Sequence, residues 1–509
     1  MPRRLWLSAG LLATGAVLLA TARLAGATPQ SGQIFRVGFA GASVEIDPQM
    51  SYISTGWWME YATAAKLYNW SDRGTKLVPE VASRAVISNR GRTYTFMLRK
   101  GFRFSDGSPV TAKNFAFAFD RVANRDLASP AYAFTHDVIG IRAKGSYKLV
   151  IRLVKPDPTF ISKLTMPFFQ ATSTTLPLNQ EVVNGYPSAG PYYFASNAVN
   201  TLTTLRRNPY WRGNRSAHVD GVDVQWGLDE DAAFQQVQAD QLDEAFVSGG
   251  NAQSAAQQFG VNKTRFWAMP QNCLGLLMFN RLNPLFGRSV ALRKAVNWAV
   301  DRTAYAALAG PYAGTPWTHL LPPLFPGSIG RKSLQPYSAH ANLTKARKLA
   351  GAYVANRRIT VGYRSSGSIF QAQAQLVHDA LVQLGFKPGN ITMKGYSGGD
   401  LYAEMGRRGT DLDMGVSMGY CADYPYLGLY GVLKSFVVAG SKYSRRLDAV
   451  RNRPKALGKL DLEITRNLAP AAVMRTYNNL YFFSGRVDPR SLKYNRVYQD
   501  WSIPALALK

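Results

Sequence analysis

One short motif in the chain has the pattern of a catalytic serine. Residues 395–399 read Gly-Tyr-Ser-Gly-Gly, which fits the G-x-S-x-G turn that presents the nucleophile of α/β-hydrolases, between a predicted strand and a predicted helix. In that fold the catalytic histidine follows the serine along the chain. All five histidines precede Ser397, the last being His378. We therefore interpret the motif as a glycine-rich turn that opens a helix, and a secreted serine hydrolase is only a remote alternative.

The other patterns of catalysis are missing as well. The histidines are scattered singly, with no H-E-x-x-H and no Cys-x-x-Cys spacing that would hold a metal. His378 stands beside Asp379 in an apolar helix pattern, which is typical of a histidine on a helix surface. No phosphate-binding G-x-x-x-x-G-K-[ST] occurs. The sequence predicts a binding protein that is not an enzyme and needs no cofactor or metal.

The start of the chain has the pattern of a secretory signal peptide. Arg3 and Arg4 precede a short apolar run over residues 5–20, and Ala25-Gly26-Ala27 provides the small residues that signal peptidase accepts. A retained anchor is the alternative, although the run is short for a bilayer crossing. No cysteine lies near the expected cut, which argues against a lipid-modified N-terminus. Cleavage after residue 27 would place the protein in a periplasm or outside the cell.

Two cysteines, Cys273 and Cys421, stand 148 positions apart. An even pair in an exported chain predicts one long-range disulfide, and two buried free thiols are the alternative. Such a bond would close a long loop and contribute about 4–5 kcal/mol in the chain-entropy model.

Length and charge narrow the class further. Without residues 1–27, 482 of the 509 residues remain, too many for a single hydrophobic core, so two or three domains are expected. The formal net charge is +29, and +26 without the three arginines of the signal segment. Anionic lipid, cell-wall polymer or nucleic acid could be attracted to such a chain. The basic residues occur as scattered pairs and match no nucleic-acid-binding consensus, which favours solvated faces and no nucleic-acid partner.

Strands alternate with helices along the chain, which predicts α/β domains with mixed sheets. In the segment 93–98 the apolar side chains alternate, and Thr111 is the expected N-cap of the next helix, with Asn114 in the third helical position. We expect strands at 34–39, 93–98, 147–153, 222–226, 359–363 and 391–394, and helices from 111, at 232–239, 290–305, 371–384 and 400–407.

An ordered series of short motifs resembles the signature of the family 5 extracellular solute-binding proteins, the substrate-capture components of peptide-type ABC importers. The motifs are LVPEVA at 77–82, YTFMLRKG at 94–101, FSDGSPVTA at 104–112, GPY at 190–192, RNPYW at 207–211, LRKAVNWAVDR at 292–302 and CADY at 421–424. The resemblance covers nearly all of the chain after the signal segment. It implies that Cys273 and Cys421 form the disulfide of oligopeptide-binding members.

The resemblance also implies the fold, a large three-domain variant of the type II periplasmic-binding-protein fold. Two lobes with mixed sheets would close over a ligand in the cleft between them. The expected divisions are domain I at 28–72, 189–271 and 481–509, domain II at 73–188, and domain III at 272–480.

Candidate ligand-binding residues follow from the same resemblance. Asp423 matches the aspartate that pairs with the α-ammonium of a bound peptide, and Tyr420 could pack against the ligand backbone. Arg364, at the end of a predicted strand, could receive a ligand carboxylate. The remaining candidates are Glu45, Trp57 and Trp58, although a core position for one tryptophan is equally compatible with the sequence.

These residues predict a monomer that captures a short peptide and delivers it to the permease subunits of an ABC importer. One departure from the family pattern bears on the ligand: residues 425–429 read Pro-Tyr-Leu-Gly-Leu where an acidic or amide residue and proline are usual. The alternative ligand is a non-peptide solute, such as an anionic compound, an oligosaccharide, an opine or a metal chelate.

Overall fold

The computed structural model describes residues 33–421 and 425–509. The predicted signal peptide and Asp423 therefore lie outside the described residues. Internal contacts join residues 33–509 into one unit, and the expected division into three domains stays a prediction. None of the described helices is both long and apolar enough to cross a membrane.

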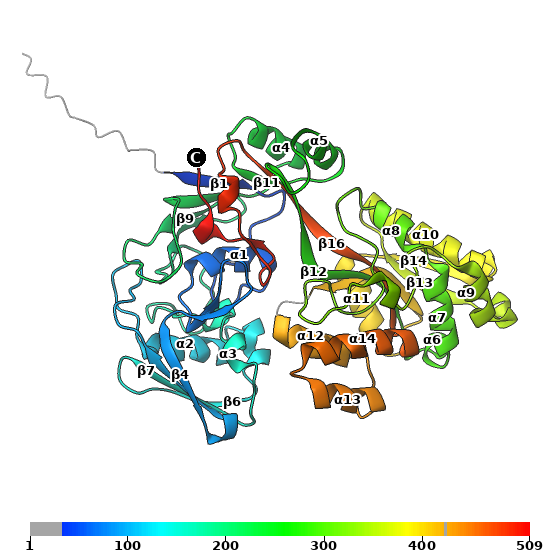
Figure 1. Ribbon diagram of the computed structural model, residues 1–509, viewed down its shortest axis with the longest axis horizontal. Helices are drawn as coiled ribbons and strands as arrows, with labels where there is room; N and C mark the ends of the chain where they lie inside the picture. Colours follow the sequence, from blue (N-terminus) through cyan, green and yellow to red (C-terminus); the bar gives the residue numbers. More distant parts are fainter. Residues whose placement is uncertain (1–32, 422–424) are drawn as a thin grey trace, which may run out of the picture. The chain divides into compact units, whose positions relative to one another are not determined.

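A ten-stranded mixed sheet carries most of the fold (Figure 1). Its strands, in spatial order, are β14 (Ile391–Tyr396), β13 (Ile359–Arg364), β15 (Met414–Cys421), β12 (Phe266–Phe279), β16 (Ala471–Phe483), β11 (Glu244–Phe246), β1 (Ile34–Gly38), β10 (Gly221–Gln225), β9 (Leu202–Arg207) and β8 (Tyr192–Ala198). The long strands β12 and β16 run antiparallel side by side and link the two halves of this order.

A second, four-stranded antiparallel sheet confirms the predicted alternation. Its strands, in spatial order, are β4 (Ala82–Ser88), β5 (Thr93–Leu98), β7 (Lys148–Leu153) and β6 (Val138–Ala143). In β5 the side chains of Tyr94, Phe96 and Leu98 are buried, whereas those between them are partly exposed. The sheet therefore turns one apolar face to the core.

Helix α2 (Ala112–Ala123) packs on this sheet and begins as predicted. The backbone N–H of Thr111 donates to Asn114 Oδ1 at 2.8 Å, which forms one half of a capping box. The predicted stripe of Phe115, Ala118, Phe119 and Val122 is buried.

The remaining longer helices accompany the large sheet and its connections. They are α1 (Ser54–Thr63), α4 (Glu230–Gln238), α5 (Gly249–Phe259), α7 (Val290–Ala299), α8 (Arg302–Ala307), α9 (Leu343–Ala350), α10 (Ser368–Leu384), α11 (Gly398–Gly406), α12 (Pro425–Ser435), α13 (Lys442–Val450) and α14 (Pro454–Leu468).

The prediction of one helix over 290–305 was wrong. The chain leaves the helical conformation at Val300 and Asp301, which separate α7 from α8. The Asp301 carboxylate accepts a hydrogen bond from the backbone N–H of Ala304 at 2.8 Å and so caps the first turn of α8. An aspartate that can bond its own backbone favours a helix start over a helix interior, and this local preference decided the break.

Successive residues of the central strands point to opposite faces of the large sheet, as the period of a strand requires. On one face Leu277, Val361 and Val416 pack with α7 and α10. On the other face Leu276 and Val473 pack with α14 and its neighbours. Both faces of this part of the sheet are therefore buried, which holds the ends of its strands in fixed positions.

The capping role of Asp301 can be tested by substitution. Asp301→Ala should lower the free energy of unfolding by about 1 kcal/mol, because the first turn of α8 loses a hydrogen-bond acceptor. Denaturant unfolding measures the change. Asp379→Ala removes an exposed helical carboxylate that caps nothing, and it should change stability by less than about 0.5 kcal/mol. Equal stability of the two variants would contradict the capping role.

Candidate functional site

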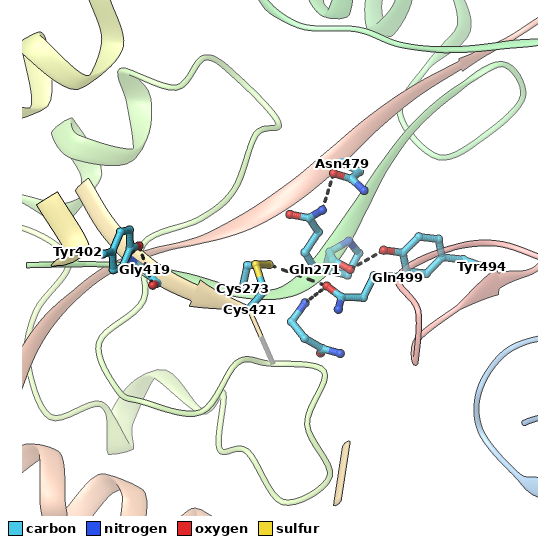
Figure 2. Close-up of a disulfide and its surroundings, with 10 residues drawn as sticks. Gln271, Cys273, Tyr402, Gly419, Cys421, Asn479, Tyr494 and Gln499 are labelled. Atoms are coloured by element: carbon cyan, nitrogen blue, oxygen red, sulfur yellow. Dashed lines mark hydrogen bonds between the residues drawn. A yellow bond between two sulfur atoms is a disulfide. The ribbon is translucent and has the colours of Figure 1, made fainter. Parts of the chain in front are cut away.

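The predicted disulfide joins Cys273 of β12 to Cys421 of β15 (Figure 2). The two cysteines are direct partners in the antiparallel ladder. Gln499, from the C-terminal part of the chain, accepts a hydrogen bond from the backbone N–H of Asn272 at 2.7 Å. The disulfide thus ties the end of β15, where the CADY motif begins, to β12.

Arg364 is the last residue of β13, at the same edge of the sheet. β13 runs parallel to β15, with Val361 opposite Met414, so both strands end in the same direction. Ligands of open α/β sheets bind outside the carboxyl ends of parallel strands. The edge that holds Arg364 and Tyr420 is therefore a suitable place for a ligand.

The Arg364 guanidinium has no acidic partner among the described residues. Its central carbon lies 4.0 Å from the ring centroid of Phe370, a cation–π contact, and its Nε is buried without a hydrogen-bond partner. A Cβ added at Gly398, at the start of α11, would lie 3.3–3.5 Å from the guanidinium. An available cation beside a helix N-terminus favours an anionic ligand group.

Tyr402 of α11, which no sequence pattern identified, completes this edge (Figure 2). Its hydroxyl donates to the carbonyl oxygen of Gly419 at 2.8 Å and accepts from the N–H of the same residue at 2.7 Å. The Tyr402 hydroxyl thus makes the two hydrogen bonds to the Gly419 backbone that a neighbouring strand would otherwise make. Partial burial raises the pKa of Tyr402, and the positive charge of Arg364 opposes that shift.

Tyr420 turns its side chain inward. Its hydroxyl donates to the carbonyl oxygen of Leu320, and its ring centroid lies 6.3 Å from that of Phe436. Burial raises the pKa of this tyrosine. A packing contact with a ligand backbone, as the sequence suggested, stays a prediction.

A cavity of about 1050 Å³ lies beside Tyr420, Tyr402 and Cys421. Most of its wall is apolar, and the described residues that line it include three cations, Arg281, Arg293 and Lys442, and no acidic side chain. Its size suits a drug-sized molecule.

Glu45, Trp57 and Trp58 lie in another part of the fold. Glu45 is exposed. The indole N–H of Trp57 donates to the carbonyl of Ser51 at 2.9 Å, and that of Trp58 to the carbonyl of Trp501 at 2.8 Å. Both tryptophans are at least 96% buried, so the structure favours the core position for each.

Ser397 and the buried His319 both have structural partners. Ser397 caps α11: its hydroxyl donates to Asp400 Oδ2 at 2.7 Å and accepts from the N–H of Asp400. The buried His319 bonds Asp461 through Nδ1 at 2.5 Å and faces the carbonyl of Ile329 through Nε2. Both ring nitrogens of His319 are thus engaged, so this imidazole is not paired with a nucleophile. The described residues contain no group of three or more side chains that could hold a metal ion.

Comparison with known proteins agrees with this geometry. The sequence profile described as "Bacterial extracellular solute-binding proteins, family 5 Middle" matches residues 76–426, more than half of the chain. A putative ABC transporter peptide-binding protein of Brucella ovis is 25% identical over 305 residues, which is 58% of this chain and 56% of the relative. The probable deoxycholate-binding periplasmic protein YgiS of Escherichia coli is 25% identical over 331 residues, 57% of each protein. The chain thus matches little more than half the length of these relatives.

Solved structures resemble nearly all of the chain. Clavulanic acid biosynthesis oligopeptide binding protein 2 superposes with a TM-score of 0.78 at 21% identity, over 94% of this chain and 95% of the other. The unliganded open form of the murein tripeptide-binding protein MppA gives 0.74 at 18% identity, over 94% and 98%. These similarities confirm the fold class, the two-lobed periplasmic-binding-protein fold with mixed sheets.

The family whose profile matches the chain and the solved structures that resemble it are binding proteins. The chain belongs to family 5 of the bacterial extracellular solute-binding proteins.

The contribution of the disulfide can be measured directly. Replacing Cys273 and Cys421 together by serine should lower the free energy of unfolding by about 4–5 kcal/mol, because the unfolded chain regains the entropy of a long loop. Denaturant unfolding with and without a reductant provides the internal control. The reductant should destabilise the wild type to the level of the variant and leave the variant unchanged. A variant as stable as the oxidised wild type would contradict the bond.

Proposed function

We propose that the protein is the exported substrate-binding component of an ABC importer and that it captures a short peptide for delivery to a membrane permease. Family membership supports the capture of a solute, and the names of relatives, among them the periplasmic oligopeptide-binding protein OppA of Haemophilus influenzae, support a peptide. The observation that carries the proposal is the sheet edge where Arg364, without an acidic partner among the described residues, lies at the carboxyl end of β13, beside β15.

In this proposal the two ends of the peptide are recognised by opposite charges. Arg364 receives the carboxylate, because a guanidinium offers several donors in a planar fork. Asp423, two residues after the disulfide-anchored Cys421, pairs with the α-ammonium. Tyr420 and Glu45 are further candidate contacts.

A second candidate keeps the transport role but replaces the peptide by an anionic solute with an apolar body. The cavity beside Tyr420 favours this ligand, because its described lining is apolar and basic without an acidic residue. Proteins similar to this chain include one described as binding deoxycholate and one in complex with agropinic acid.

Substitution of the proposed ammonium partner distinguishes the two candidates. Asp423→Ala should weaken the binding of a tripeptide by about 2–5 kcal/mol, because a desolvated ammonium loses its counter-charge. Isothermal titration calorimetry measures the loss. Asp379→Ala, which removes a carboxylate from the surface of α10, is the control and should leave the affinity unchanged.

If a peptide binds equally well to the wild type and to Asp423→Ala, Asp423 is not its partner. If no peptide binds but deoxycholate does, the second candidate replaces the first.

A further inference from the structure

Arg475 is a buried cation that no described residue neutralises. It lies on β16 opposite Gly275 of β12, and it is 7% exposed. Its Nε and Nη1 are buried without a hydrogen-bond partner, and it forms no ion pair with a described residue. An unpaired buried charge is costly, so an unsatisfied guanidinium in a native fold indicates that a group outside the described chain pairs with it.

Arg302, a neighbouring arginine, shows how the fold satisfies a guanidinium that has a purely structural role. Arg302 is fully buried and forms no ion pair with a described acidic side chain. Its Nε donates to the carbonyl of Val473 at 2.6 Å, and its Nη1 and Nη2 donate to the backbone and side-chain oxygens of Asn297, each at 2.8 Å. Carbonyl oxygens thus satisfy Arg302, whereas Arg475, two residues beyond Val473, lacks them.

The space around Arg475 is kept open by a glycine. The guanidinium carbon lies 4.1 Å from the ring centroid of Tyr477. A Cβ added at Gly275 would lie 3.0 Å from the Tyr477 hydroxyl and 3.4 Å from Cγ of Arg475. Any side chain at position 275 would therefore crowd both Arg475 and Tyr477.

Hydroxyl groups face the same region. The hydroxyls of Tyr305 and Ser417 lie 3.2 Å apart, and Ser417 donates to Gln373 Oε1 at 2.6 Å. Burial raises the pKa of Tyr305, and the positive charge of Arg475 opposes that shift. Arg475 therefore lies within electrostatic range of this hydroxyl cluster.

The strand register connects this region with the edge that holds Arg364. Arg475 of β16 lies opposite Gly275 of β12, and Gly275 lies opposite Gly419 of β15. The Tyr402 hydroxyl, which bonds the backbone of Gly419, belongs to α11, and the first residue of that helix lies beside the Arg364 guanidinium. Gly419 and Tyr402 thus link the two guanidinium groups with unpaired nitrogens at the ligand edge.

We propose that Arg475 binds a second anionic group of the captured solute, so that the solute class is a dicarboxylate, such as a short peptide with a glutamate at its carboxyl end. Arg364 receives one carboxylate and Arg475 the other. This assignment rests on the proposed capture of a solute at this edge, but not on the solute being a peptide. The anionic group of the ligand would provide the counter-charge that the buried guanidinium of Arg475 lacks, and so would offset the cost of leaving that charge unpaired.

Titration with glutarate and with its monoamide, glutaramate, at equal ionic strength tests the assignment without assuming a peptide. The wild type is expected to bind glutarate at least tenfold more tightly than the monoamide. Arg475→Met should bind the two equally. Arg408→Met removes one exposed charge from the surface near α11 and should keep the wild-type preference. A wild type without preference, or an Arg475→Met variant that retains it, overturns the inference.

The thermal midpoint of the ligand-free protein separates binding from a structural role. Arg475→Met should raise the midpoint, because an apolar side chain replaces an unpaired buried charge. A lowered midpoint would show that the guanidinium stabilises the fold and would overturn the inference. A second variant tests the binding role independently: Arg475→Lys should lose at least threefold of the preference, since an ammonium lacks the planar fork. An unchanged preference in Arg475→Lys overturns the inference as well.

The dipeptides Ala-Glu and Ala-Gln distinguish this inference from the proposed function. A preference for glutarate that depends on Arg475, with no binding of either dipeptide, would leave the dicarboxylate site standing and argue against peptide capture. Equal binding of both dipeptides would support peptide capture and overturn the second anion site.

Discussion

The ladder of β12 is the constraint on which the rest of the binding region depends. This strand pairs with β15 on one side and with β16 on the other, and the Cys273–Cys421 bond locks it to β15. Both neighbours bear candidate ligand contacts, Tyr420 on β15 and Arg475 on β16. Because apolar clusters cover both faces of this part of the sheet, the contacts are held on rigid strands rather than on loops.

Two register shifts interrupt the ladder between β12 and β16. The register between β12 and β16 shifts between Pro270 and Leu274 and again between Gly275 and Leu276. Bulges of this kind redirect side chains and occur preferentially near functional sites. The second shift lies at the pair that admits Arg475 and Tyr477. Arg364 and Arg475 keep nitrogens without a hydrogen-bond partner, whereas the fully buried Arg302 donates to carbonyl oxygens.

The sequence predicted what short-range patterns determine. The strand Thr93–Leu98, the capping box of Thr111 and Asn114, and the disulfide all have local or compositional signals, and the structure confirms them. The prediction of one helix over 290–305 was wrong because it followed the apolar periodicity and gave too little weight to Asp301, which caps the start of a second helix. Tyr402 and Arg475 could not be predicted, since their significance depends on Gly419 and Gly275, which only the folded sheet brings beside them.

Native mass spectrometry of the protein purified from its own cells, under non-reducing conditions, tests the central claim most directly. The account predicts a retained mass that matches a short peptide or another small solute with two carboxylates, released when the protein unfolds. A retained neutral sugar or a cationic compound would contradict a binding edge built from unpaired arginines.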